Sequence, residues 1–494
     1  MNWHLFTNKQ QSNQYTLIYI AVAAIVAMTI SLWIGLQQSV WFDEAYSILV
    51  AKQEPAEIIQ LAAADVHPPM FYLILHMWGN AWGWSDAPLR LFSALALGGS
   101  VVVAGLLTRR LFGDRAAIMS VVFIALAPLL LRYGFEIRMY ALASFIGIAA
   151  TYVLVCARDA KKYSVWLWVL YAVLVAFGML TLYHLALLWV AHVVWLLYMD
   201  RGKLKRFWEL PWVWAFLGAV LLFTPWLPKF VGQLGNGAMA NIGQPMNIGQ
   251  LLGVLSFNTL YKPLWQVNML DTVIILALIV GGVVAFRRVY KQKLQRSKLL
   301  LVTCYIAVPI LLFILVSFAR PLYVERYLSH VAIGLMILAG VLVAGATESF
   351  KPASRAVVYI LCVTILSMGV YGLAVVGNYN FQRMQKPSVA VTASSIDCTG
   401  ATVVAADPYV ATELTYYLPP TCDMRFYSEW QTMGGGYAPL SGSPLWLGDM
   451  NVPRLTGVMY YVYYGEPKLK INTEYKEIYS QTNDGLTLVV YRAE

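Results

Sequence analysis

Two adjacent carboxylates, Asp43 and Glu44, follow the first long apolar segment of the chain, within the run Trp41-Phe42-Asp43-Glu44-Ala45-Tyr46-Ser47. The preceding segment, 15–35, has no charged residue and is long enough to cross a hydrocarbon core, which takes about 20 residues. The pair therefore lies at a membrane interface, where neighbouring carboxylates are costly to place and indicate a site. A carboxylate there can accept a proton as a general base or bind a hard cation.

Other ionisable and aromatic residues recur at the ends of later apolar segments, on the same predicted side of the membrane as Asp43. Ionisable groups at such depths are more often functional than incidental, so we expect these side chains to converge on one cavity. The candidate substrate-binding residues are Asp65, His67, Glu136, Arg138, Tyr140, His184, Arg326 and Tyr327.

Five of the candidates also have a structural interpretation. Asp43 has the residue type of a cap for a helix beginning at Glu44. Glu136 could form an ion pair within its loop with Arg138. Arg326 could extend toward lipid headgroups as an interfacial anchor. His184 could be a polar residue at the end of a span with its hydrogen bonds satisfied. His67 precedes two prolines that suit the first turn of a helix, which explains the prolines but not the histidine.

The composition indicates the kind of scaffold that holds these residues. The 494 residues are 60% hydrophobic and 12% charged, and the mean hydropathy is +0.63. Soluble domains contain about 25% charged residues, so the chain is predicted to cross the membrane many times. The net charge of +10 comes from short basic clusters between apolar segments. Such clusters are typical of cytoplasmic loops, so no nucleic-acid partner is expected.

About eleven transmembrane helices are predicted, with a further apolar segment at 68–84 that lies in the interface. Placing 68–84 in the interface leaves most Lys and Arg residues on the cytoplasmic side, whereas a spanning helix there would invert that distribution. Its aromatic residues also suit a membrane surface. The predicted spans are 15–36, 90–108, 116–131, 139–157, 164–181, 185–199, 211–226, 270–286, 299–318, 327–346 and 356–376.

The outer side receives three long segments. They are a first outer loop at 37–89 with interfacial helices, a glycine-rich loop at 227–269, and the tail. The glycine-rich loop is either a mobile cover over an acceptor groove or a plain connector. We predict a membrane domain at 1–376, a linker at 377–390 and a small extracytoplasmic α/β domain at 391–494, which binds the acceptor or shields the groove. An exported compartment permits a disulfide between Cys398 and Cys422.

Four motifs in order resemble a known enzyme group. They are Trp41-Phe42-Asp43-Glu44-Ala45-Tyr46-Ser47, Asp65-Val66-His67-Pro68-Pro69-Met70-Phe71-Tyr72-Leu73, Arg90-Leu91-Phe92-Ser93-Ala94-Leu95 and Glu136-Ile137-Arg138-Met139-Tyr140-Ala141-Leu142. They are similar to the signatures of bacterial GT-C glycosyltransferases of the family 39-like group, which includes protein O-mannosyltransferases and the aminoarabinose transferases of lipid A. The resemblance covers roughly residues 15–376 and includes the order and topology of the spans.

The resemblance implies transfer of a sugar from a polyprenyl-phosphate carrier to a hydroxyl of a lipid, glycan or protein, with inversion. The acidic catalytic residue maps onto Asp43, which would act as general base, with Glu44 beside it. The leaving phosphate needs positive charge, for which Arg138 and Arg326 are expected. Some GT-C enzymes bind a divalent cation, and Mg²⁺ or Mn²⁺ would suit these carboxylates. No ligand spacing is diagnostic, so no metal is assigned.

Two other classes share some of these sequence features. A transporter would also have many spans, but it should show paired halves with interrupted helices, and no internal repeat is visible. A non-catalytic scaffold of envelope glycan assembly could keep the same architecture with a degenerate site. For either enzyme or scaffold, the expected location is the bacterial cytoplasmic membrane, with the site and the C-terminal domain on the outer face.

Overall fold

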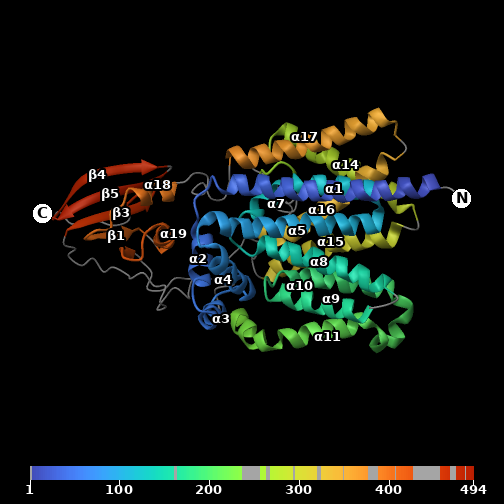
Figure 1. Ribbon diagram of the computed structural model, residues 1–494, viewed down its shortest axis with the longest axis horizontal. Coiled ribbons are helices and arrows are strands. Elements are labelled where there is room, and N and C mark those ends of the chain that lie inside the picture. The colour runs from blue at the N-terminus through green and yellow to red at the C-terminus, as the bar shows by residue number, and fades with distance from the viewer. Residues whose placement is uncertain are drawn as a thin grey trace. The chain divides into compact units, whose positions relative to one another are not determined.

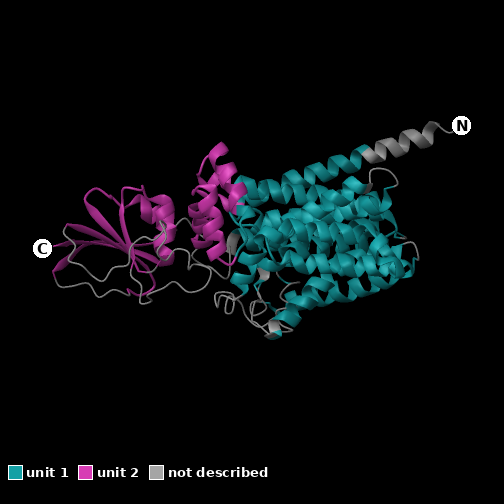
Figure 2. Ribbon diagram, turned by 90° about the horizontal axis from the view of Figure 1, so that it is seen from below, with its two compact units in different colours: residues 1–33, 67–71, 90–375 teal, residues 34–66, 72–89, 376–494 magenta. Residues whose placement is uncertain are grey.

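The computed structural model divides the chain into two compact units, which are coloured separately in Figure 2. Unit 1 comprises residues 1–33, 67–71 and 90–375, and unit 2 comprises residues 34–66, 72–89 and 376–494. Much of the predicted glycine-rich loop and most of the predicted linker lie outside the described residues. The described residues are 3–160, 164–235, 256, 258–262, 267–292, 295–319, 324–348, 350–376, 388–406, 408–426, 457–467, 474–483 and 485–493.

Unit 1 is a bundle of long apolar helices that run side by side (Figure 1). Its longer helices are α1 (Trp3–Gly35), α5 (Asp86–Phe112), α8 (Tyr140–Asp159), α9 (Ser164–Met179), α10 (Leu185–Met199), α11 (Pro211–Phe223), α14 (Met269–Tyr290), α15 (Arg296–Ala319), α16 (Ser329–Ala346) and α17 (Pro352–Val376). Shorter elements are α6 (Asp114–Ala125), α7 (Pro128–Gly134), η1 (Arg201–Glu209), η2 (Thr224–Trp226), α12 (Leu227–Gly235) and η6 (Glu325–Leu328).

The multi-spanning helical class is confirmed, and each of the eleven predicted spans corresponds to a helix or a bent pair of helices. Among the described residues, eight helices are long and apolar enough to cross a membrane, or up to ten if each of two bent pairs is one span. The predicted single span at 116–131 is one of these pairs, because α6 and α7 meet at 60° where Pro128 begins the second helix. The predicted span at 185–199 bends by 111° into η1, and the apolar part of α9 is shorter.

Close contact between α6 and α16 holds the centre of unit 1. At Gly340 of α16, an added Cβ would lie 2.7 Å from the Cα of Ser120, so only glycine allows the two backbones to approach this closely. Ser120 also donates a hydrogen bond to the carbonyl oxygen of Ile337 at 3.3 Å. In a lipid bilayer, helices gain little from burying apolar surface against each other. Close packing at small residues and hydrogen bonds from hydroxyl groups therefore drive their association. The packing fixes the position of α16, which begins directly after Tyr327 and Leu328.

Unit 2 combines the first outer loop with the C-terminal region. The loop forms α2 (Phe42–Ala51), α3 (Pro55–Ala64) and α4 (Met70–Trp82), whose first two residues belong to unit 1. Helix α4 corresponds to the predicted interfacial helix at 68–84. Its 13 residues extend about 20 Å at 1.5 Å per residue, which is too short for a hydrocarbon core of about 30 Å.

The C-terminal region forms a five-stranded sheet in the order β2-β1-β3-β5-β4. Strand β1 pairs in parallel with β2 and β3, and β5 pairs antiparallel with β3 and β4. Cys398 and Cys422 form a disulfide, and the predicted α/β character of this region is confirmed. The elements are α18 (Ser388–Ser394), β1 (Ala401–Ala405), α19 (Pro408–Tyr417), β2 (Asp423–Phe426), β3 (Val458–Tyr464), β4 (Tyr475–Asn483) and β5 (Leu486–Ala493).

Candidate functional site

A buried ion pair lies at the connection between α7 and α8 in unit 1. A guanidinium nitrogen of Arg132 is 3.6 Å from a carboxylate oxygen of Glu136, and both side chains are 1% exposed. The Arg132 guanidinium also lies 4.8 Å from the ring centre of Phe135. The hydroxyl of Ser93, on α5, donates to the backbone oxygen of Glu136 at 2.6 Å. The connection is therefore held to its neighbours by charge and by hydrogen bonding, and it carries Arg138 directly after it.

Arg138 and His67 are brought together, as the sequence predicted for residues of two separate motifs. Nη2 of Arg138 is 3.5 Å from Nε2 of His67, and Arg138 is 3% exposed. The amide of Met70 donates to the oxygen of Leu180 at 3.0 Å, which anchors the segment after His67 to the turn that follows α9. This end of unit 1 therefore presents a fixed cation and an imidazole side by side, a combination suited to phosphate oxygens.

A second group at this end of unit 1 is aromatic. The ring of His184 stacks on Tyr327, with ring centres 4.2 Å apart and planes 15° apart. The Tyr327 ring is also 6.3 Å from that of Tyr140. The guanidinium of Arg326 lies 5.9 Å from each of these two tyrosine rings, which is within the range of a cation–π interaction. Four predicted residues from three distant segments therefore form one cluster.

His184 stays neutral at physiological pH. Burial lowers its pKa to about 3, and the nearby His67 and His330 lower it further by charge repulsion. His184 directly precedes α10, and its residue is partly exposed although Nδ1 is buried. Within the described part of the chain, Nδ1 has no hydrogen-bond partner. His330, at the start of α16, was not predicted as a candidate because it follows Arg326 and Tyr327 inside an apolar span.

Replacing His184 by Phe is expected to stabilise the protein relative to wild type as the pH falls. The folded pKa lies below the unfolded value of about 6.5, so the unfolded chain takes up a proton between these values that the folded chain does not. Wild type therefore loses stability below pH 6.5. Because His184 is partly exposed, we reduce the expected effect. At pH 5 the free energy of unfolding of the variant should exceed that of wild type by about 1–2 kcal/mol. Thermal unfolding in detergent at pH 7.5 and 5 measures it, and an equal pH dependence in both proteins would contradict it.

In unit 2, Asp43 and Glu44 lie in the first turn of α2, buried to 2% and 1% exposure. The structural interpretation of Asp43 as the cap of a helix beginning at Glu44 is wrong, because the helix begins at Phe42 with Trp41 as its cap. It is Glu44 that accepts a hydrogen bond from the Trp41 amide, at 3.4 Å. Glu44 therefore satisfies a backbone donor at the helix start.

Asp65 lies at the C-terminal end of α3 and is 3% exposed. The hydroxyl of Tyr72 donates to its Oδ2 at 3.4 Å. The Tyr72 ring makes an edge contact with Tyr46 of α2, with ring centres 6.5 Å apart. The aromatic pair links Asp65 to the helix that carries Asp43, so three predicted carboxylates belong to one buried network of unit 2.

Helix α19 of the C-terminal region holds the turn before Asp43, and sequence reasoning missed this. Glu413 accepts a hydrogen bond from the amide of Phe42 at 3.1 Å, and the hydroxyl of Tyr417 accepts one from the amide of Val40 at 2.6 Å. The rings of Phe42 and Tyr409 meet edge to face, 4.7 Å apart. The sequence indicated a helix at 412–417, but no local pattern relates it to a turn that is 371 residues away.

The described residues contain no group of three His, Cys, Asp or Glu side chains that could hold a metal ion. Of the predicted carboxylates of unit 2, Glu44 accepts from the Trp41 amide and Asp65 accepts from the Tyr72 hydroxyl.

Comparison with known proteins gives one family match and several fold matches. A family described as dolichyl-phosphate-mannose-protein mannosyltransferase matches residues 66–228. This segment includes His67, Glu136, Arg138, Tyr140 and His184, whereas Asp43 lies before it. A search of curated proteins found no significant match.

Two solved structures share the architecture. ArnT from Cupriavidus metallidurans, bound to undecaprenyl phosphate, has a TM-score of 0.64 at 13% identity, covering 97% of this chain and 98% of that one. The archaeal oligosaccharyltransferase AglB from Archaeoglobus fulgidus, in complex with an inhibitory peptide and a dolichol-phosphate, has a TM-score of 0.52 at 11% identity. That match covers 82% of this chain and 63% of AglB. Identities this low establish a common fold. The family match covers residues 66–228 of 494, so the comparisons show a fold shared with these enzymes and a local similarity to the mannosyltransferase family.

Proposed function

We propose that the protein transfers a sugar from a polyprenyl-phosphate donor to a hydroxyl acceptor on the extracytoplasmic side of the bacterial cytoplasmic membrane. The main support is the gathering of Arg138, His67 and Arg326 at one end of unit 1, in a fold that ArnT uses to bind undecaprenyl phosphate. Cations at this depth suit a phosphate that remains attached to a membrane-embedded chain.

Each charged residue has a role that follows from its chemistry. Asp43 takes the proton of the acceptor hydroxyl as that oxygen attacks the anomeric carbon, a contribution of about 10²–10⁴-fold. The bond from the anomeric carbon to the phosphate oxygen breaks on the opposite side, so the sugar is inverted. Arg138 and Arg326 stabilise the negative charge that develops on the departing phosphate, which leaves without a proton donor. The neutral His184 can share hydrogen bonds without adding charge.

Two observations support the proposed extracytoplasmic location of the site. The disulfide between Cys398 and Cys422 favours an oxidising compartment for the C-terminal region. Arg109, Arg110 and Arg158 lie at the ends of α5 and α8 that face away from Arg138, as the positive-inside rule expects for cytoplasmic loops.

Reconstitution with defined donors tests the function. Purified protein in nanodiscs is incubated with a panel of undecaprenyl-phosphate-linked sugars and with lipid, glycan and peptide acceptors. Release of undecaprenyl phosphate together with a glycosylated acceptor is expected for one donor. Movement of an intact donor between leaflets of a proteoliposome, without cleavage, would instead identify a transporter. Donor binding without either reaction would identify a scaffold.

Glu413 is expected to position Asp43 for this reaction, although it does not itself contact substrate. Replacing Glu413 by Ala removes the acceptor for the Phe42 amide and loosens the turn before Asp43. A displaced catalytic group lowers turnover by about 10–100-fold. Replacing Glu413 by Gln keeps an oxygen acceptor, so most of the activity should remain. The measurement is kcat and KM for the donor, with the loss expected in kcat.

Thr415, on the same helix, supplies the matched control. Its hydroxyl donates to Ala411 of its own helix at 2.7 Å, so replacing Thr415 by Ala should leave kcat unchanged. If the Ala variant of Glu413 raised KM alone, or if the Gln variant were as inactive as the Ala variant, the positioning role would be contradicted.

A further inference from the structure

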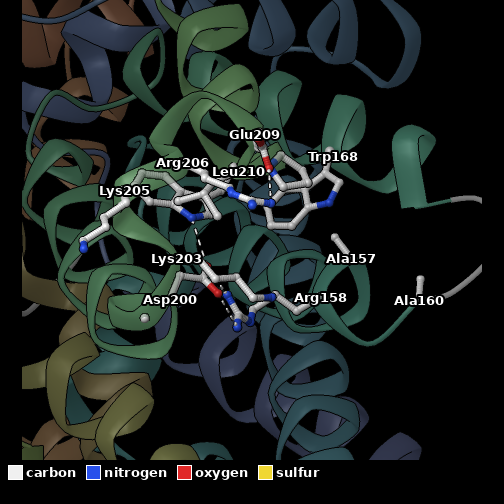
Figure 3. A pocket seen from close by; sticks show the side chains of 13 residues that line it. Ala157, Arg158, Ala160, Trp168, Asp200, Lys203, Lys205, Arg206, Glu209 and Leu210 are labelled. Atoms are coloured by element: carbon white, nitrogen blue, oxygen red, sulfur yellow. Dashed lines mark hydrogen bonds and ion pairs between the residues drawn. The ribbon is translucent and has the colours of Figure 1, made fainter.

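A hollow of about 750 Å³ lies beside η1, the segment that joins α10 to α11 (Figure 3). His184 precedes the first residue of α10, and η1 follows its last, so the hollow lies at the end of unit 1 away from His184. Its volume is in the range of about 300–1,000 Å³ that small-molecule sites occupy. It is thus a cavity apart from the residues of the proposed transfer site.

The floor of the hollow is a fixed polar network. The guanidinium of Arg158 donates to both carboxylate oxygens of Asp200, at 2.8 and 3.3 Å. The indole of Trp212 donates to Oδ2 of Asp200 at 3.1 Å. The Arg158 guanidinium also lies 5.3 Å from the ring centre of Trp195. Because Arg158 and Asp200 form two hydrogen bonds and contact two indoles, the pair is rigid. The negative charge of Asp200 is balanced by Arg158 inside the protein.

The rim of the hollow carries an excess of positive charge. Lys203, Lys205 and Arg206 line it from η1 and are exposed. Glu209 is the partner of Arg206, but the pair is 3.7 Å apart and both side chains are more than two-thirds exposed, so it is weak. In the described part of the chain, neither lysine has an ion-pair partner. The rim is therefore able to take an anion.

Exposed apolar side chains alternate with these cations along the same segment. Leu204, Phe207 and Trp208 are 38%, 36% and 64% exposed. The segment joins two apolar helices, so it lies where the hydrocarbon region ends. Aromatic and aliphatic side chains beside Lys and Arg at such a level are typical of an element that lies in the membrane surface.

We propose that this hollow binds the phosphate of an anionic phospholipid headgroup, with Lys203, Lys205 and Arg206 as its ligands and Trp208 against the upper acyl chain. A soluble anion would use the cations but would have no use for the exposed ring of Trp208. The site is independent of the proposed sugar transfer, and its lipid would anchor the bend between α10 and α11.

Lipid retention tests the site. The full-length protein is taken from nanodiscs containing phosphatidylglycerol and phosphatidylcholine into detergent, and bound lipid is counted by native mass spectrometry. Retention of phosphatidylglycerol is expected. Each surface cation contributes about fivefold, so the K203Q/K205Q/R206Q variant should bind on the order of 100-fold more weakly. The matched control is R287Q/R288Q/K291Q, which removes three exposed cations from the end of α14, where Arg288 donates to Ala346.

Two further measurements decide whether the bound anion is a phospholipid headgroup or free phosphate. Trp208→Ala should also reduce phosphatidylglycerol retention, and 10 mM inorganic phosphate should not displace the lipid. The proposal is overturned if the control variant loses as much lipid as the rim variant, if both lipids are retained equally, or if Trp208→Ala has no effect and inorganic phosphate competes.

Discussion

Replacing Asp43 by Asn should lower sugar transfer by about 10²–10⁴-fold and leave donor binding nearly unchanged. Asn has the size of Asp and can hydrogen-bond, but it cannot take the proton of the acceptor hydroxyl. Asp43 is buried in the first turn of α2, where the backbone and the Glu413 contact fix its position. The measurement is kcat for transfer of a labelled sugar, with donor affinity measured separately.

Two carboxylates of the same loop are the controls for this variant. Glu54 precedes α3 and is exposed, so Glu54→Gln should leave transfer unchanged. Glu44→Gln keeps an oxygen for the Trp41 amide and should lose much less activity than Asp43→Asn. If Asp43→Asn transferred sugar at the wild-type rate, Asp43 would not be the base.

Replacing Glu136 by Leu should lower the free energy of unfolding by about 3–5 kcal/mol, because it leaves the charge of Arg132 buried without its carboxylate. Both partners are 1% exposed, so water cannot solvate the remaining guanidinium. Phe135 offers only its ring face, at 4.8 Å. Loss of helical signal in a titration with sodium dodecyl sulfate measures the change.

An exposed ion pair of the same unit provides the comparison. Arg110 and Asp159 are 3.1 Å apart and are 40% and 56% exposed, so Asp159→Asn should cost less than about 1 kcal/mol. Combining Arg132→Met with Glu136→Leu removes both buried charges and should recover most of the lost stability. An effect of Glu136→Leu as small as that of Asp159→Asn would mean that the buried charge finds another partner.

Much of the fold could be predicted because the membrane imposes a strong pattern. Long uncharged segments such as 15–35 and 327–346 are helices in the structure, and the β-rich runs after 400 are strands. The bend between α6 and α7 was missed, because apolar residues continue through it and the hydropathy of the run does not change. Pro128 was the available signal.

The candidate site was only partly predictable. His67 and Arg138 belong to recognisable motifs, and the structure places them 3.5 Å apart. The pairing of Glu136 with Arg132 was not predicted, because Arg138, two residues away, is nearer in sequence than Arg132, four residues away. Glu413 lay beyond any local rule, because its partner is a backbone amide, which leaves no trace in residue types.

The hydrogen bonds from the turn before Asp43 to α19 affect when the turn can form during biosynthesis. Val40 and Phe42 emerge from the ribosome early, but their acceptors Tyr417 and Glu413 are made 371 or more residues later. At about 5–20 residues per second, the delay is roughly 20–75 s. During that time the membrane helices can insert while the acidic turn is incomplete. Under the proposed function, a nascent chain would gain activity only after α19 has been made and has folded against this turn, so unfinished chains would be inactive.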